Sequence, residues 1–210
     1  DIVGHAVRAM YLYTAVADVA RLTGDEGFMA AMERVWRNVT QKKMYITGGI
    51  GPSAHNEGFT VDYDLPNDSA YAETCASIGM ALWNHRLLLL HGEGRFGDIL
   101  EQVLYNGLLS GVALDGEKFF YVNPLSSRGK HHRQPWYDCA CCPTNVVRFL
   151  PSVGGYFYAA SDDGIWVNLY ASSEASVTFG KPGSEKRVKI TQESEYPWSG
   201  DIKITVDPEE

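Results

Sequence analysis

The chain has 210 residues, of which 45 % are hydrophobic, so it can bury one substantial core and part of a second domain. Its formal net charge is −8 and it has no long cluster of Lys and Arg, which argues against nucleic acid or an anionic membrane as a partner. No apolar run approaches the roughly 20 residues that span a bilayer. Its 4 cysteines are too few and too bunched for a disulfide scaffold, so we expect a reducing, cytoplasmic location.

Four segments in the first half carry apolar residues at helical spacing: residues 3–21, 26–39, 71–90 and 97–110. A turn containing glycine joins the first two segments, and another joins the last two, so each pair predicts a helical hairpin. The hairpins align at an offset of 68 residues, which superposes Gly24 on Gly92 and Phe28 on Phe96. Repeated helical hairpins predict a solenoid or a closed helical toroid.

A stretch rich in Gly, Pro and Asn, residues 44–68, separates the two hairpins and has no hydrophobic period. Loops of this length inside compact domains usually carry function. A further helix is predicted to start at Pro143, because proline suits the first helical position. We expect it to continue to about residue 158, with an interruption at Pro151.

The pattern changes after residue 160. Alternating β-branched and aromatic residues predict strands in three segments: residues 164–179, 186–194 and 201–206. The predicted fold class is therefore mainly α with a β C-terminal part, divided into residues 1–160 and 161–210. We expect Trp166 and Tyr170 to pack against the helical part or against a second subunit of a homo-oligomer. Because the first helix has no cap and the last strand stops at "DPEE", we expect a fragment of a larger protein.

The segment "CACCPTN", residues 139–145, holds three of the four cysteines. Cys141 and Cys142 directly precede the predicted helix, where free N–H groups and the helix dipole favour thiolate over thiol. The fourth cysteine, Cys75, follows Glu73 near another predicted helix start, which Asp68 or Ser69 could cap. Residues two positions apart point to nearly opposite sides of a regular helix. Glu73 and Cys75 can therefore share a ligand only if the first turn is irregular.

Three thiolates and one carboxylate would fill a tetrahedral zinc site, and soft sulfur ligands select zinc over magnesium or calcium. The spacing matches no common zinc-finger or zinc-ribbon pattern, and Cys139 could replace either neighbour as a ligand. One alternative is that the cysteines are small buried hydrophobes, and another is a closed structural zinc site. The nearby acid-bearing loop "SAHNEGF" favours a catalytic site, because a structural site does not need it.

Four motifs together resemble glycoside hydrolase family 127, the retaining β-L-arabinofuranosidases: "GGIGPSAHNEGFT", "YAETCASIGMALWNHRL", "FFYVNPL" and "CACCPTNVVRFLPSVGGYFYA". The resemblance covers about residues 1–205. It implies an (α/α)6 barrel followed by β-sandwich domains. Residues 1–160 would then be the C-terminal part of the catalytic barrel, and residues 161–210 the start of an incomplete β-sandwich.

The same resemblance implies roles for individual residues. It implies four zinc ligands: Glu73, Cys75, Cys141 and Cys142. Cys141 would also be the nucleophile, and Glu57 the general acid/base. His5 and Tyr121 match positions that contact the sugar, whereas Cys139 receives no role.

The expected function is a retaining glycoside hydrolase that releases L-arabinose from β-L-arabinofuranosides. Its substrates would be plant-derived arabinofuranoside glycans or glycoproteins, with zinc as the cofactor. An alternative from another class is a non-catalytic carbohydrate-binding or zinc-stabilised structural module. Turnover by the full-length protein would separate the two.

Overall fold

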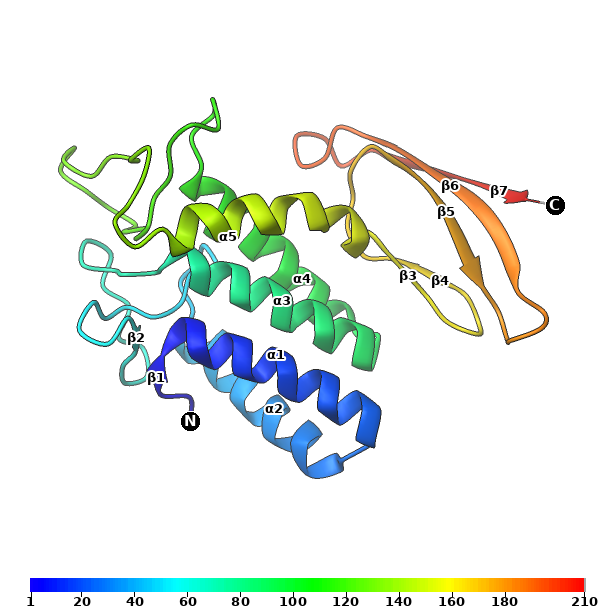
Figure 1. Ribbon diagram of the computed structural model, residues 1–210, viewed down its shortest axis with the longest axis horizontal. Helices are drawn as coiled ribbons and strands as arrows, with labels where there is room; N and C mark the ends of the chain where they lie inside the picture. The colour runs from blue at the N-terminus through cyan, green and yellow to red at the C-terminus, as the bar shows by residue number, and fades with distance from the viewer. Residues whose placement is uncertain (210) are drawn as a thin grey trace. The chain divides into compact units, whose positions relative to one another are not determined.

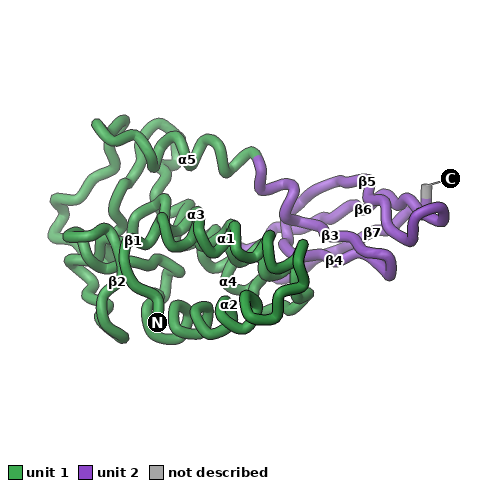
Figure 2. The backbone as a smooth tube through the Cα atoms, turned by 60° about the horizontal axis from the view of Figure 1, so that its bottom comes forward, with its two compact units in different colours: residues 1–151 green, residues 152–210 purple. Residues whose placement is uncertain are grey.

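The computed structural model describes residues 1–209 and divides the chain into two compact units. Unit 1 covers Asp1–Pro151 and unit 2 begins at Ser152 (Figure 2). Unit 1 is helical and unit 2 consists mainly of strands. Among the described residues, no helix combines the length and apolar character that crossing a membrane requires.

Unit 1 holds five α-helices within the described residues: α1 (Ala6–Thr23), α2 (Glu26–Asn38), α3 (Thr74–His91), α4 (Gly94–Gln102) and α5 (Cys141–Phe149) (Figure 1). The two predicted hairpins are α1 with α2 and α3 with α4. Gly24 and Gly92 end the first helix of each hairpin in the left-handed conformation, with φ of 68° and 66°. Their N–H groups bond to carbonyls four residues earlier, which closes the helix in the same way twice. The hairpin repeat is therefore confirmed at its turns.

The centre of unit 1 is α3, which contacts α1, α4 and α5. Its side chains are buried around most of its circumference, and Trp83 is 0 % exposed. The indole N–H of Trp36 donates to Asn84 Oδ1 at 2.8 Å, and its ring packs edge-on against Phe96 with centroids 5.1 Å apart. These contacts join α2 to the second hairpin, so the two hairpins share one core.

Several predicted helix boundaries were wrong, among them the start of α4, which lies at Gly94 inside the predicted turn. α3 begins at Thr74 with Glu73 as its N-cap residue, so neither Asp68 nor Ser69 caps it. α5 begins at Cys141, and Pro143 occupies the third helical position; the first turn tolerates proline because its N–H groups have no partner within the helix. The helix expected to reach residue 158 becomes a 3-10 segment, Leu150–Tyr156.

The long segment between the hairpins returns to the start of α1. Strand β1 (Gly4–His5) pairs antiparallel with β2 (Gly58–Phe59), so that His5 lies opposite Gly58. A Cβ atom on Gly58 would lie 2.0 Å from the carbonyl oxygen of Gly4, which means that only glycine fits there. The N–H of Ala6 donates to the carbonyl of Glu57 at 3.0 Å. This pairing holds Glu57 beside the first turn of α1.

Unit 2 is a small antiparallel β region. β3 (Tyr158–Ala160) pairs with β4 (Ile165–Val167). A second, three-stranded sheet has the order β5-β6-β7 and contains β5 (Ser173–Phe179), β6 (Lys186–Ser194) and β7 (Ile202–Glu209). Helices followed by antiparallel strands agree with the expected class. The division into an (α/α)6 barrel over residues 1–160 and a β-sandwich over residues 161–210 stays a prediction.

Candidate active site

Three helices of unit 1 begin at the same end of the unit (Figure 1). His5 is the N-cap residue of α1, Glu73 is the N-cap residue of α3, and Cys141 is the first residue of α5. Helix starts present unpaired N–H groups and the positive end of the helix dipole. Their convergence therefore favours negatively charged side chains at this point.

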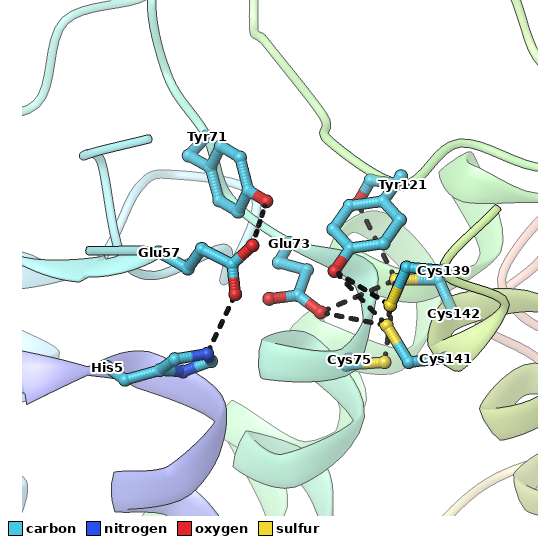
Figure 3. A network of polar contacts seen from close by, with 9 residues as sticks. All are labelled: His5, Glu57, Tyr71, Glu73, Cys75, Tyr121, Cys139, Cys141 and Cys142. Atoms are coloured by element: carbon cyan, nitrogen blue, oxygen red, sulfur yellow. Dashed lines mark hydrogen bonds and ion pairs between the residues drawn. The ribbon is translucent and has the colours of Figure 1, made fainter. Parts of the chain in front are cut away.

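One ligand atom from each of Glu73, Cys75, Cys141 and Cys142 lies within 4.8 Å of the others. The Sγ atoms of Cys75 and Cys142 are 3.4 Å apart, and those of Cys141 and Cys142 are 3.8 Å apart. Glu73 Oε1 lies 3.5 Å from Cys141 Sγ and 3.6 Å from Cys142 Sγ (Figure 3). The structure thus brings together the four residues that the sequence predicted as ligands.

The expected irregular helical turn is not what brings Glu73 and Cys75 together, because Glu73 precedes the helix as its N-cap residue. Glu73 has φ −61° and ψ 136°, which is extended backbone, and the helix begins only at the next residue. Cys75 is already helical. The change of conformation between them turns both side chains towards the same point, which a regular helix would prevent.

The electrostatics of this group suit a cation. Burial raises the pKa of Glu73, and burial also raises the pKa of Cys141 to about 12. The hydrogen bond with Cys75, followed by burial, raises the pKa of Cys142. Glu73 is 2 % exposed, and its Oε2 atom has no hydrogen-bond partner among residues 1–209. A metal cation would offset the repulsion between these groups as anions, so the donor set fits a metal site.

A second group of polar contacts surrounds Glu57. The Nε2 atom of His5 lies 2.8 Å from Glu57 Oε2, and the hydroxyl of Tyr71 donates to Glu57 Oε1 at 2.8 Å (Figure 3). Ligand atoms of His5, Glu57 and Glu73 lie within 4.8 Å of one another. Glu73 therefore belongs to both groups, and the two form one site.

Tyr121 lies at the cysteine side of this site. Its hydroxyl is 3.2 Å from Cys141 Sγ and 4.0 Å from Cys139 Sγ. Its backbone is held by the N–H of Thr74, which donates to its carbonyl at 2.9 Å. Cys139 is exposed and lies outside the group of four ligand atoms, so the geometry selects Cys141 and Cys142 as the pair that joins Cys75.

Sequence reasoning missed Tyr71. Its hydroxyl meets a carboxylate 14 positions earlier, across a loop with no periodic pattern, so no spacing rule connects the two. Burial, followed by the hydrogen bond to Glu57, raises the pKa of Tyr71. The only available signal was its place in "YAETC", directly before the residues expected to bind metal.

Comparison with known proteins gives consistent matches over both units. Residues 1–155 match the family model described as the beta-L-arabinofuranosidase GH127 catalytic domain, and residues 164–210 match the corresponding middle domain. The chain is 40 % identical to the non-reducing end beta-L-arabinofuranosidase of Bifidobacterium longum over 97 % of its own length and 32 % of that protein.

Solved structures agree with these matches. A GH127 beta-L-arabinofuranosidase from Geobacillus stearothermophilus is 48 % identical, with a TM-score of 0.92 over 98 % of this chain and 34 % of that chain. Another GH127 beta-arabinofuranosidase is 53 % identical with the same TM-score of 0.92, over 97 % of this chain and 31 % of that one. The chain thus spans about a third of the length of these relatives. The chain belongs to glycoside hydrolase family 127.

Proposed function

We propose that the protein containing this chain is a retaining glycoside hydrolase that releases L-arabinose from β-L-arabinofuranosides. Plant-derived arabinofuranoside glycans or glycoproteins are its substrates. The observation that carries the proposal is the shared position of Glu73, whose carboxylate lies near both Cys141 and Glu57. A nucleophile and a proton donor at one site are what retaining glycosidases need.

Zinc is the proposed cofactor, with Glu73, Cys75, Cys141 and Cys142 as its ligands. Soft thiolates favour this metal over magnesium or calcium, and four ligands fill its tetrahedral shell. Bound zinc would keep the sulfurs as thiolates, while three thiolates and a carboxylate around a dication leave excess negative charge that preserves the reactivity of Cys141.

In the first step, the Cys141 thiolate attacks the anomeric carbon of the sugar. The glycosidic C–O bond breaks as the C–S bond forms, and Glu57 gives its proton to the leaving oxygen. In the second step, Glu57 takes a proton from water, and the water oxygen replaces sulfur at the anomeric carbon. Two displacements retain the anomeric configuration. His5 and Tyr121 are proposed to contact the sugar.

The test is release of L-arabinose from a panel of furanosides by the full-length protein and its Cys141→Ser variant. We expect hydrolysis of β-L-arabinofuranosides by the parent and none above background by the variant. A parent that binds zinc or sugar without turnover would favour a structural or carbohydrate-binding module instead. A Cys141→Ser variant with full turnover would remove Cys141 as the nucleophile.

A further inference from the structure

We propose that Tyr71 is a positioning residue for Glu57: its hydroxyl fixes the orientation in which that carboxyl group transfers protons to and from the substrate. The inference rests on the proposed function, because it takes Glu57 as the general acid/base. It adds a residue that neither the metal ligands nor the expected sugar contacts include.

Each oxygen of the Glu57 carboxyl group has a polar partner. The Tyr71 hydroxyl donates to Oε1 and the His5 ring nitrogen lies at Oε2, each at 2.8 Å (Figure 3). With a partner on each oxygen, the carboxyl plane cannot rotate without losing a contact. With either partner alone, rotation of the carboxyl group about the Cγ–Cδ bond of Glu57 would break one contact instead of two.

Tyr71 itself is fixed at its backbone. Its N–H donates to the carbonyl of Pro52 at 3.1 Å, and its carbonyl accepts from the N–H of Asn123 at 3.0 Å. The next residue, Ala72, has a φ of 39°, a conformation that costs of order 1 kcal/mol or more for a non-glycine residue. The N–H of Ala72 bonds to the carbonyl of Gly51 at 2.9 Å, which holds this conformation. The backbone around Tyr71 is thus tied both to the loop that carries Glu57 and to the segment that carries Tyr121.

The ring of Tyr71 also links the two sides of the site. It packs edge-on against the ring of Tyr121, with centroids 6.1 Å apart and planes at 67°. The hydroxyl of Tyr121 in turn lies 3.2 Å from Cys141 Sγ. Two tyrosines in contact therefore bridge the proposed proton donor and the proposed nucleophile, so their packing sets the two groups relative to each other.

The orientation of Glu57 affects the rate most for leaving groups that depart only when protonated. An alkyl or sugar leaving group departs only with its proton, whereas a dinitrophenolate leaves readily without one. Loss of the Tyr71 hydroxyl should therefore slow poor leaving groups and spare good ones. A residue with a purely structural role would slow both alike.

The experiment compares the full-length parent with its Tyr71→Phe variant on aryl and alkyl β-L-arabinofuranosides of graded leaving-group pKa, with kcat/KM as the readout. We expect a loss of about tenfold to hundredfold for the poorest leaving group, and a loss of no more than about threefold for dinitrophenol. The variant keeps the ring that packs against Tyr121, and its melting temperature and metal content verify the fold.

Tyr45→Phe is the matched control. Tyr45 is buried where Tyr71 is half-buried, packs against Ala70 and Ala72, and donates its hydroxyl to the carbonyl of Pro66 at 3.1 Å, away from Glu57. We expect it to leave the dependence on leaving group unchanged. An equal loss on all substrates with Tyr71→Phe, or no loss at all, would overturn the positioning role. A parent that hydrolyses none of the substrates would instead overturn the proposed function.

Discussion

The sulfur atoms of Cys75 and Cys142 lie 3.4 Å apart although 67 positions separate the two residues. One comes from the first turn of α3 and the other from the first turn of α5. Both residues are buried, and neither forms a disulfide. As thiolates beside a buried carboxylate these two sulfurs would repel each other, and a shared metal cation would offset that repulsion, which leads to the first prediction.

Removing one sulfur should abolish metal binding. We expect about one zinc per chain in protein purified under reducing conditions and much less in Cys75→Ser, because three donors hold zinc far more weakly than four. Elemental analysis measures both. Cys139→Ser is the control, since Cys139 lies outside the group of four ligand atoms, and it should retain the metal. Absence of zinc from parent and variants alike would contradict the proposed cofactor.

Removing the carboxyl group of Glu57 should remove the proton donor of the first chemical step and the base of the second. In the full-length Glu57→Ala variant, we expect turnover of activated aryl substrates to fall by about 10²–10⁴-fold. Azide, which needs no base, should restore turnover and yield a glycosyl azide of retained configuration. Glu117→Ala, which removes an exposed loop carboxylate, should have no effect. Undiminished activity in Glu57→Ala, without rescue, would exclude Glu57 from the mechanism.

The backbone pairing that holds His5 beside Glu57 depends on one glycine. In Gly58→Ala, the new Cβ would lie 2.0 Å from the carbonyl oxygen of Gly4, so β1 and β2 must separate. We expect activity to fall by about 10²-fold, because the proton donor shifts, while zinc content stays near the parent value. Steady-state kinetics and elemental analysis measure the two effects.

Gly94→Ala is the matched control for Gly58→Ala. A Cβ on Gly94 meets no atom within 4 Å, and this residue begins α4, so alanine should leave activity intact and stabilise the fold by up to about 1 kcal/mol. Equal activities of Gly58→Ala and Gly94→Ala would show that the β1–β2 pairing does not position the site.

Acid should destabilise the fold through His85. Burial, followed by the charge of Arg86, lowers the pKa of His85 from 6.5 to about 4. Between these values the unfolded chain binds a proton that the folded chain does not. The contribution of the neutral, buried His85 to the free energy of unfolding is therefore fully present above about pH 6.5. It is lost as the pH falls towards 4, because protonation then favours the unfolded chain.

Urea unfolding at pH 7 and pH 5 measures this contribution. We expect the parent to lose about 1 to 2 kcal/mol more than His85→Gln between these conditions, because glutamine does not titrate. Identical losses in parent and variant would mean that His85 is protonated equally in both states.

The sequence predicted what depends on local pattern. The helical hairpins followed from apolar spacing, and the turns at Gly24 and Gly92 followed from the left-handed conformation that glycine favours. The boundaries failed where several residue types can occupy a helix start. The preference of proline for the first helical position predicted a start at Pro143, but the first turn also accepts proline at the third position, where its missing N–H has no partner within the helix.

The candidate site was likewise predictable only in part. The ligand set came from a family resemblance, since the residues alone left Cys139 open as an alternative, and the structure separates it from the other three cysteines. The contact between Tyr71 and Glu57 was out of reach, because it depends on how two aperiodic loops meet in space. Tertiary contacts of this kind leave no period in the sequence.

The convergence of three helix starts has a consequence for the order in which the helical unit unfolds. A metal ion at this point would join α3 to α5 across 67 positions of chain, and so act as a cross-link that exists only in the folded state. Chelation would then release the first turns of both helices before it affects their opposite ends. This end of the helical unit would thus depend most on bound metal: rigid when the metal is present and the first to open without it.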